Sequence, residues 1–229
     1  MTKQISNALL LVSLLFSTQS FAQNLKDAYI DTNKKTFKKE FNHLAIMPLQ
    51  VAPTVKPPET IRQLIITEIT NKFIKSNFNL LPTEKITAIE NQFKNLYPNN
   101  LNDKQNTTIT EHTQRELFFQ YNVDGTLTIQ ILAVGAPFSK DKAVWGGTSQ
   151  KIKHRGDGLF SKGYEGYTSA SAIRVIVADR SGKVAYRWEG GIEVMKSRNG
   201  TKFEDLPKES LWQNEKRIRN AIKYVLKPL

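Results

Sequence analysis

The stretch at residues 121–135, YNVDGTLTIQILAVG, constrains the fold most, because it has the pattern of a long strand with one buried face. Small or apolar residues recur at every second position, and Thr126, Thr128 and Gln130 alternate with them. Successive side chains of a strand point to opposite faces, so this period of two is typical of a half-buried strand. The apolar face comprises Val123, Gly125, Leu127, Ile129, Ile131 and Ala133. A sheet is therefore the expected scaffold.

Further strands and helices are expected on both sides of this stretch. Strands are predicted at residues 43–50, 77–82, 122–135, 169–179 and 183–196. A turn at 179–182 joins the last two, and Gly190 with Gly191 indicates a bulge. Helical spacing of apolar residues predicts helices at 60–76, 83–97, 109–120 and 207–226, with an Asn- and Thr-rich loop at 99–108. The expected fold class is α/β, a single sandwich in which a mainly antiparallel mixed sheet is covered by helices.

The first residues have the pattern of a secretory signal. Lys3 precedes an apolar run at 8–16, and Ser-Phe-Ala ends the pattern, so we expect cleavage after Ala22. The alternative is an uncleaved membrane anchor, but the run is about half of the roughly 20 residues needed to span a bilayer. The chain has no cysteine, which excludes disulfides, thiolate metal sites, a cysteine nucleophile and a lipid-modified cysteine. A bacterial periplasm is the predicted location.

Charge and composition divide the remaining chain into two parts. Residues 23–40 are polar and rich in lysine, which predicts a flexible basic arm, either a solvated linker or a binding segment. Residues 41–229 are expected to form one domain. The net charge of +12 favours anionic partners, such as lipid headgroups or an acidic protein face. Nucleic acid is not expected as a partner of an exported protein.

Two charge patterns on the predicted helices indicate how they face solvent. Glu68 and Lys72 are four residues apart, a spacing that supports an ion pair on the helix at 60–76. The helix at 207–226 has an apolar stripe that includes Leu211, and its outer face is basic. The basic residues are Lys216, Arg217, Arg219 and Lys223.

Four segments together resemble a group of bacterial envelope domains. The segments are HLAIMPL at 43–49, NFNLLP at 77–82, YNVDGTLTIQ at 121–130 and IRVIVADRSGKVAYRWEG at 173–190. The group includes the amino-terminal domain of the Tol-Pal propeller protein, the lipoprotein activators of penicillin-binding proteins and the periplasmic domain of the curli secretion channel. The resemblance implies a non-enzymatic periplasmic protein that binds another envelope component, as an accessory or assembly factor of a secretion or cell-wall machine.

The chain departs from this group in two ways. It has no lipidation cysteine, although many members of the group have one. Its segment at 136–167 lies near the position where the curli channel has membrane-spanning hairpins, but basic residues gather there. They are Lys151, Lys153, His154 and Arg155. Lipid-facing cations strongly destabilise a membrane strand, so the sequence disfavours a pore.

No motif in the sequence indicates a chemical reaction. His43, His112 and His154 lack the spacing of metal ligands, so neither a metal nor another cofactor is expected. Asp124 and Asp179 adjoin a strand or a turn, where aspartate commonly makes local hydrogen bonds. We therefore expect a protein that is not an enzyme. The alternative is a periplasmic ligand carrier or hydrolase with an unrecognised site, which would need a pocket with converging polar groups.

The segment at 136–167 contains the candidate partner-binding residues. It is rich in glycine and aromatic residues, and it is either a long β-hairpin or a functional excursion. Aromatic and arginine side chains are enriched where interfaces carry binding energy. The candidates are Trp145, Lys151, Lys153, Arg155, Tyr164 and Tyr167. The alternative is a twisted hairpin whose aromatic side chains cover the sheet. Neither the partner nor the oligomeric state follows from the sequence.

Overall fold

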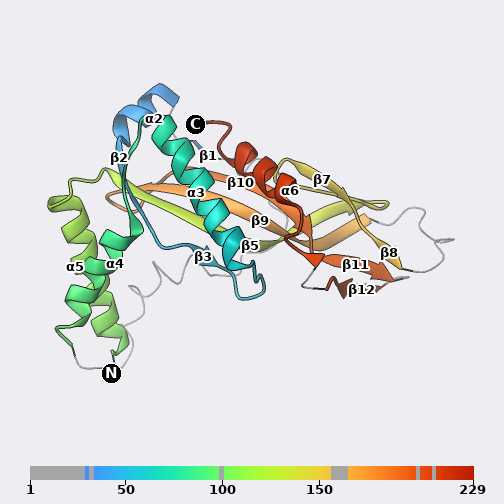
Figure 1. The fold of residues 1–229 in the computed structure, drawn as a ribbon, viewed down its shortest axis with the longest axis horizontal. Helices are drawn as coiled ribbons and strands as arrows, with labels where there is room; N and C mark the ends of the chain where they lie inside the picture. The colour runs from blue at the N-terminus through green and yellow to red at the C-terminus, as the bar shows by residue number, and fades with distance from the viewer. Residues whose placement is uncertain (1–28, 31–33, 98–100, 156–164, 200–201, 208–209) are drawn as a thin grey trace, which may run out of the picture.

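A computed structural model of the chain describes residues 29–30, 34–97, 101–155, 165–199, 202–207 and 210–229 (Figure 1). The predicted signal and its cleavage after Ala22 lie outside these residues. The helices are α2 (Lys34–Glu40), α3 (Glu59–Lys75), α4 (Thr83–Lys94), α5 (Asp103–Phe119) and α6 (Glu215–Val225). No helix in the described part of the chain has the length and apolar character needed to cross a membrane.

One large mixed sheet forms the scaffold. Its strands are β1 (Tyr29–Ile30), β2 (His43–Ile46), β3 (Gln50–Val51), β4 (Asn79–Leu81), β5 (Gly125–Ser139), β6 (Lys142–Trp145), β7 (Thr148–Lys151), β9 (Glu165–Asp179) and β10 (Val184–Val194). The main order is β1-β10-β9-β5-β2-β4, in which β2 runs parallel to β4 and β5, and β9 runs antiparallel to β5 and β10. A second sheet has the order β12-β11-β8, with β12 (Lys202–Asp205), β11 (Lys196–Asn199) and β8 (His154–Arg155). The prediction of an α/β fold with a mainly antiparallel mixed sheet is confirmed.

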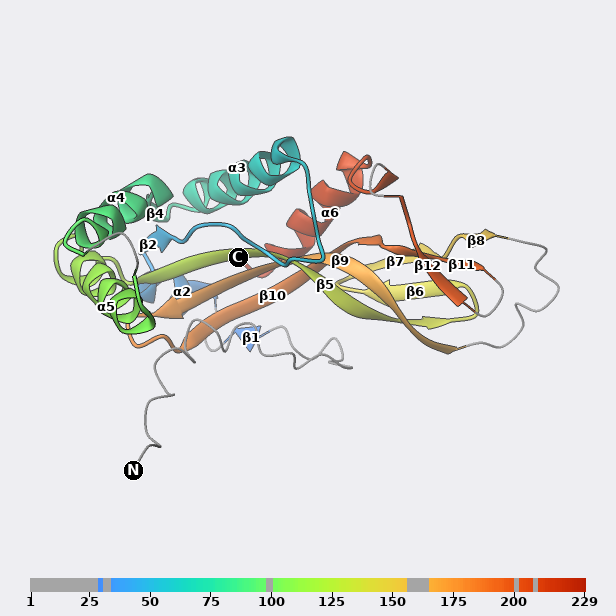
Figure 2. The same cartoon turned by 90° about the horizontal axis from the view of Figure 1, so that it is seen from below.

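Helices α3 and α6 cover one side of the sheet (Figure 2). The core there unites the face of β5 that carries Leu127 and Ile129 with the apolar stripes of both helices. Arg219 of α6 donates to the Glu68 carboxylate of α3, so an ion pair joins the helices. The expected pair between Glu68 and Lys72 is therefore wrong, because Glu68 reaches across to α6 instead. Burial of this apolar face supplies most of the driving force for the arrangement.

Two residues of β10 fit α6 closely onto the sheet. The Tyr186 hydroxyl is buried and donates to the main-chain carbonyl of Val225 in the last turn of α6. Burial raises the pKa of Tyr186 above the ordinary value for a tyrosine. Gly190 lies against α6, where an added Cβ would come 2.3 Å from the Ala221 carbonyl oxygen. The bulge predicted beside it is confirmed as a register shift between Gly191 and Glu193.

Helices α4 and α5 pack beside β2 and β4 around a separate small cluster that includes Ile86, Ile89 and Leu117. The prediction of a loop at 99–108 is wrong from Asp103 onward, where α5 begins, and residues 99–100 lie outside the described part. Asn102 accepts a hydrogen bond from the Gln105 main-chain N–H at 2.9 Å, and the Gln105 side chain accepts one from the Asn102 N–H at 2.9 Å. This capping box satisfies two helix-end donors and allows a polar sequence to start a helix.

The terminal helix begins later than predicted. The sequence indicated a helix at 207–226, whereas α6 starts at Glu215, where the Asn214 side chain accepts from the Arg217 N–H at 3.2 Å. Leu211 and Trp212 precede the helix and still pack against the core. The apolar pattern therefore predicted which residues are buried, but it placed the start of the helix too early.

The flexible arm predicted at 23–40 is partly wrong. Residues 29–30 pair with β10 as β1, and residues 34–40 form α2, while residues 23–28 and 31–33 lie outside the described part. Phe37 is buried, and its ring contacts those of Phe41, Phe78 and Tyr186. A single aromatic side chain fixes a lysine-rich segment that polar composition alone assigned to solvent.

Candidate functional site

Strands β5 and β9 continue well beyond the helices and form the far end of the molecule (Figure 1). The segment predicted as either a hairpin or an excursion contains the last residues of β5, then β6, β7 and β8, and the first residues of β9. Residues 156–164 lie outside the described part. A small apolar cluster fills this end. It comprises Ala136, Phe138, Ala143, Trp145, Ile152, Ala170, Ala172 and Val194. We call the segment at 136–167, together with this cluster, the hairpin end.

Gln150 of β7 closes the hairpin end against β10. Its side-chain NH2 donates to the Ile192 carbonyl at 3.0 Å, and its side-chain oxygen accepts from the Val194 N–H at 2.9 Å. The Gly191 N–H also donates to the Gly146 carbonyl at 2.8 Å. These bonds satisfy main-chain groups of β10 that an exposed strand would leave to solvent or to another chain. The hairpin is therefore held in place on the sheet, which makes its outer surface a rigid platform.

Trp145 belongs to the core of the hairpin end. Only 5% of its surface is exposed, and its indole N–H donates to the Ser171 carbonyl at 3.1 Å. The expectation that Trp145 takes part in an exposed binding site is therefore wrong. The physical reason is strand alternation, because Ala143 and Trp145 face inward while Lys142 and Val144 face solvent.

The other candidate residues are placed as follows. Lys151 on β7 is exposed, and its ammonium lies 3.2 Å from the Asp141 carboxylate. Lys153, between β7 and β8, is also exposed. Tyr167 on β9 is 49% exposed. Arg155 lies on β8, but its side chain falls outside the described part, as does the whole of Tyr164.

The register brings Tyr167 next to exposed residues that are not among the candidates predicted from the sequence. Tyr167 pairs with Pro137 across β9 and β5, and Phe138 pairs with Ala143 across β5 and β6. Val144 therefore lies on the other side of Pro137 from Tyr167. All three face outward, and Val144 is 42% exposed. Val144, Pro137 and Tyr167 thus lie in a line across three adjacent strands, and we call these three residues the apolar row.

Two lysines border the apolar row. Lys142 pairs directly with Lys151 across β6 and β7, and both side chains are exposed. Like charges directly opposite each other on a sheet face are destabilising, and Asp141 forms an ion pair with Lys151. The alternation Lys-Ala-Val-Trp at 142–145 was the sequence signal for this face, since it separates Val144 from Trp145.

Asp124 and Asp179 are engaged in local structure, as their positions beside a strand and a turn indicate. Asp124 accepts from the main-chain N–H of His43 at 2.8 Å and lies 3.6 Å from the Arg180 guanidinium. Asp179 accepts from the N–H groups of Ser181 and Lys183 at 2.8 and 2.9 Å, and from the Ser181 hydroxyl. Burial raises the pKa of Asp179, but these hydrogen bonds and the nearby Lys183 charge together outweigh it and hold the pKa below the ordinary value. Both carboxylates therefore stabilise connections between strands.

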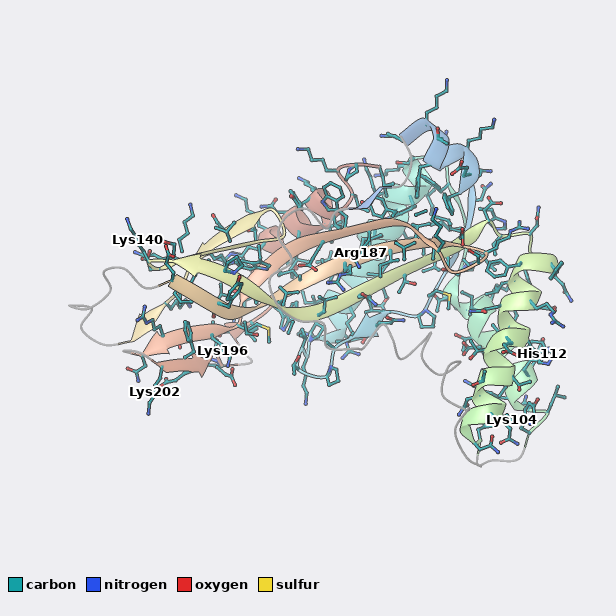
Figure 3. The ribbon with its side chains drawn as sticks, turned by 180° about the vertical axis from the view of Figure 1, so that it is seen from behind. Lys104, His112, Lys140, Arg187, Lys196 and Lys202 are labelled. Carbon is teal, nitrogen blue, oxygen red and sulfur yellow. The ribbon has the colours of Figure 1, made fainter. Side chains whose placement is uncertain are left out.

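The histidines occupy separate positions. His43 begins β2, His112 stacks on Phe93 with ring centroids 5.1 Å apart, and His154 lies on β8. Figure 3 shows His112 on α5, far from the hairpin end where Lys140 lies. In the part of the chain that the structure describes, no group of three His, Asp or Glu side chains has an arrangement that would hold a metal ion.

Comparison with protein-family models, with curated proteins and with solved structures finds no match to this chain.

Proposed function

We propose that this chain is a non-enzymatic periplasmic protein that binds another protein of the bacterial envelope, as an accessory or assembly factor of a secretion or cell-wall machine. The export pattern of residues 1–22 and the resemblance of four segments to envelope domains support the location and the class. The proposed binding site is the apolar row with its bordering lysines.

The observation that carries this proposal is the exposure of Val144, Pro137 and Tyr167 together on a rigid sheet surface. Isolated exposed apolar side chains are common on proteins, but an aligned group with an aromatic residue is typical of an interaction site. Gln150 fixes the hairpin before a partner arrives, so little ordering entropy opposes association.

Charge indicates the complementary surface. Lys142 and Lys151 face each other across β6 and β7, and acidic side chains on a partner would relieve their repulsion. The partner surface is therefore apolar at its centre and acidic at its border. The use of Asp124 and Asp179 in turns also favours binding over catalysis as the function.

The test is capture of envelope proteins by the exported protein after crosslinking in cells. A Tyr167→Ala, Val144→Ser double variant is expected to lose at least about tenfold in capture, because exposed anchors commonly contribute more than 1 kcal/mol each. Its melting temperature should stay within a few degrees of the parent, since both side chains lie outside the core.

Leu96→Ser is the matched control, because Leu96 is an exposed apolar residue that follows α4, away from the hairpin end. It should leave capture unchanged. Equal capture by the parent and the double variant would overturn the assignment of the site, as would equal losses in the double variant and the control.

A further inference from the structure

The topology gathers three helix ends at the end of the molecule opposite the hairpin end. His43 pairs with Asn79, and Leu44 pairs with Gly125, so the parallel strands β2, β4 and β5 all begin at one edge. Each of these strands follows a helix in the chain, namely α2, α3 and α5. Figure 1 shows α2 and the C-terminal ends of α3 and α5 at this end of the sheet.

Lysines of α2 dominate this surface. The helix has the sequence KKTFKKE, and Lys34, Lys35 and Lys39 are exposed while Lys38 is half-buried. Phe37 anchors the helix in the core, so these cations are held at a fixed place. Among the residues that the structure describes, no carboxylate lies within ion-pair distance of any of the four lysines.

The last turn of α3 adds two cations and an apolar side chain. Lys72 and Lys75 are exposed, and Ile74 between them is 52% exposed. Glu68 does not neutralise Lys72, because its carboxylate pairs with Arg219 of α6. The centroid of the Phe78 ring lies 6.1 Å from that of Phe37 on α2 and 5.1 Å from that of Phe73 on α3. Phe78 therefore connects α2 with this turn.

The end of α5 carries the most exposed large apolar side chain among the residues that the structure describes. Phe119 is 81% exposed and is the last residue of α5. The following chain is tied to the β9–β10 turn, because Arg180 donates to the Asn122 side chain at 3.0 Å. Uncompensated lysines therefore share one end of the molecule with Ile74 and Phe119. We call these lysines and the two apolar residues the lysine end.

We propose that the lysine end binds the anionic headgroup surface of a lipid bilayer. Protein interfaces are depleted in lysine and enriched in arginine, whereas all six cations of α2 and of the last turn of α3 are lysines. A lysine is a mobile, strongly hydrated charge, which suits a laterally averaged negative surface. Ile74 and Phe119 are available to enter the boundary between headgroups and acyl chains.

This inference is independent of the protein partner proposed above. A molecule held by its lysine end would direct the hairpin end away from the bilayer, since the two lie at opposite ends of the sheet (Figure 2). The apolar row would then face a partner rather than lipid.

The test is sedimentation of the exported protein with vesicles of phosphatidylglycerol and phosphatidylcholine, compared with vesicles of phosphatidylcholine alone. We expect binding to the anionic vesicles only, with an affinity that falls as salt is added. A Lys35→Gln, Lys39→Gln, Lys75→Gln variant should bind at least about tenfold more weakly, because each lysine near an anionic surface contributes roughly fivefold. Phe119→Ser should also weaken binding.

The matched control is Lys104→Gln, Lys140→Gln, Lys202→Gln, which removes the same charge at exposed positions away from α2 (Figure 3). It should retain most of the binding. Equal losses in the two triple variants would overturn the proposal, because net charge alone would then explain the binding.

Inorganic phosphate should compete no better than chloride at equal ionic strength. Stronger competition by phosphate would indicate that the lysine end binds free phosphate. Capture of an acidic protein without any vesicle binding would indicate a protein ligand. Either result would overturn the proposal.

Discussion

At the scale of single residues, Gly190 determines how closely α6 approaches the sheet. Besides the carbonyl oxygen of Ala221, an added Cβ would meet the carbonyl carbon at 2.9 Å, and both atoms belong to helix backbone. Backbone atoms do not move aside as the end of a flexible side chain does, so the whole helix would have to shift. The core beneath α6 would then lose contacts with Ile218 and Ile222.

We predict that Gly190→Ala lowers the free energy of unfolding by about 1–3 kcal/mol, the usual range for overpacking. Gly135→Ala is the matched control on β5, because its nearest neighbour would be Tyr167 Cδ1 at 3.7 Å, an ordinary contact. Chemical denaturation of the two variants measures the difference. A Gly190→Ala protein as stable as Gly135→Ala would show that α6 does not pack where the structure places it.

The candidate site shows what sequence reasoning resolves at this scale. Tyr167 is exposed as expected, but Trp145 is buried, and composition did not distinguish the two because both are aromatic residues in a glycine-rich segment. Strand alternation at 142–145 separates inward from outward positions, yet it becomes useful only when a strand is recognised there. The proximity of Val144 and Tyr167 depends on the pairing of β5 with both β6 and β9, which is a tertiary fact.

At the scale of elements, the long periodic segments were predicted well and the ends of helices were not. The β5 stretch and the helix at 60–76 have apolar faces that are buried against each other, so their patterns are strong. The start of α5 at Asp103 depends on the reciprocal hydrogen bonds of Asn102 and Gln105, in a segment whose composition is also typical of loops. In short polar stretches, local capping hydrogen bonds determine where a helix begins.

Helix α2 is the element whose structure differs most from what the composition of its sequence predicts. We predict that Phe37→Ala lowers the free energy of unfolding by about 3–5 kcal/mol, because a fully buried ring is lost from the core. Hydrogen exchange at residues 34–40 should accelerate far more than exchange in β5.

Lys38→Ala provides the control within the same helix, because it keeps Phe37 and removes a half-buried lysine side chain. It should change stability by less than about 1 kcal/mol. If Phe37→Ala is no more destabilising than this control, the segment at 23–40 is a flexible arm, as its composition first indicated.

At the scale of the whole molecule, β5 and β9 join its parts. Each strand is 15 residues long, and together they pass from the core beneath α3 and α6 into the separate cluster of the hairpin end. Their pairing is continuous from Gly125 with Asp179 to Ser139 with Glu165. Because the same two strands supply both clusters, the hairpin end cannot lose its structure without disturbing the ladder that supports the main core.

We therefore predict that the two clusters unfold in one cooperative transition. A variant that retains Trp145 as its only tryptophan, with Trp188→Phe and Trp212→Phe, reports on the hairpin end by fluorescence, while circular dichroism reports on the whole sheet. The two denaturation curves should coincide.

Adding Ile129→Asp buries a charge in the main core, at a cost of several kcal/mol, and should shift both curves together. Thr128→Asp, on the half-exposed opposite face, should shift them less. A fluorescence change that precedes the loss of circular dichroism would mean that the hairpin end is an independent unit, and its surface would then not be the rigid platform on which the proposed partner site depends.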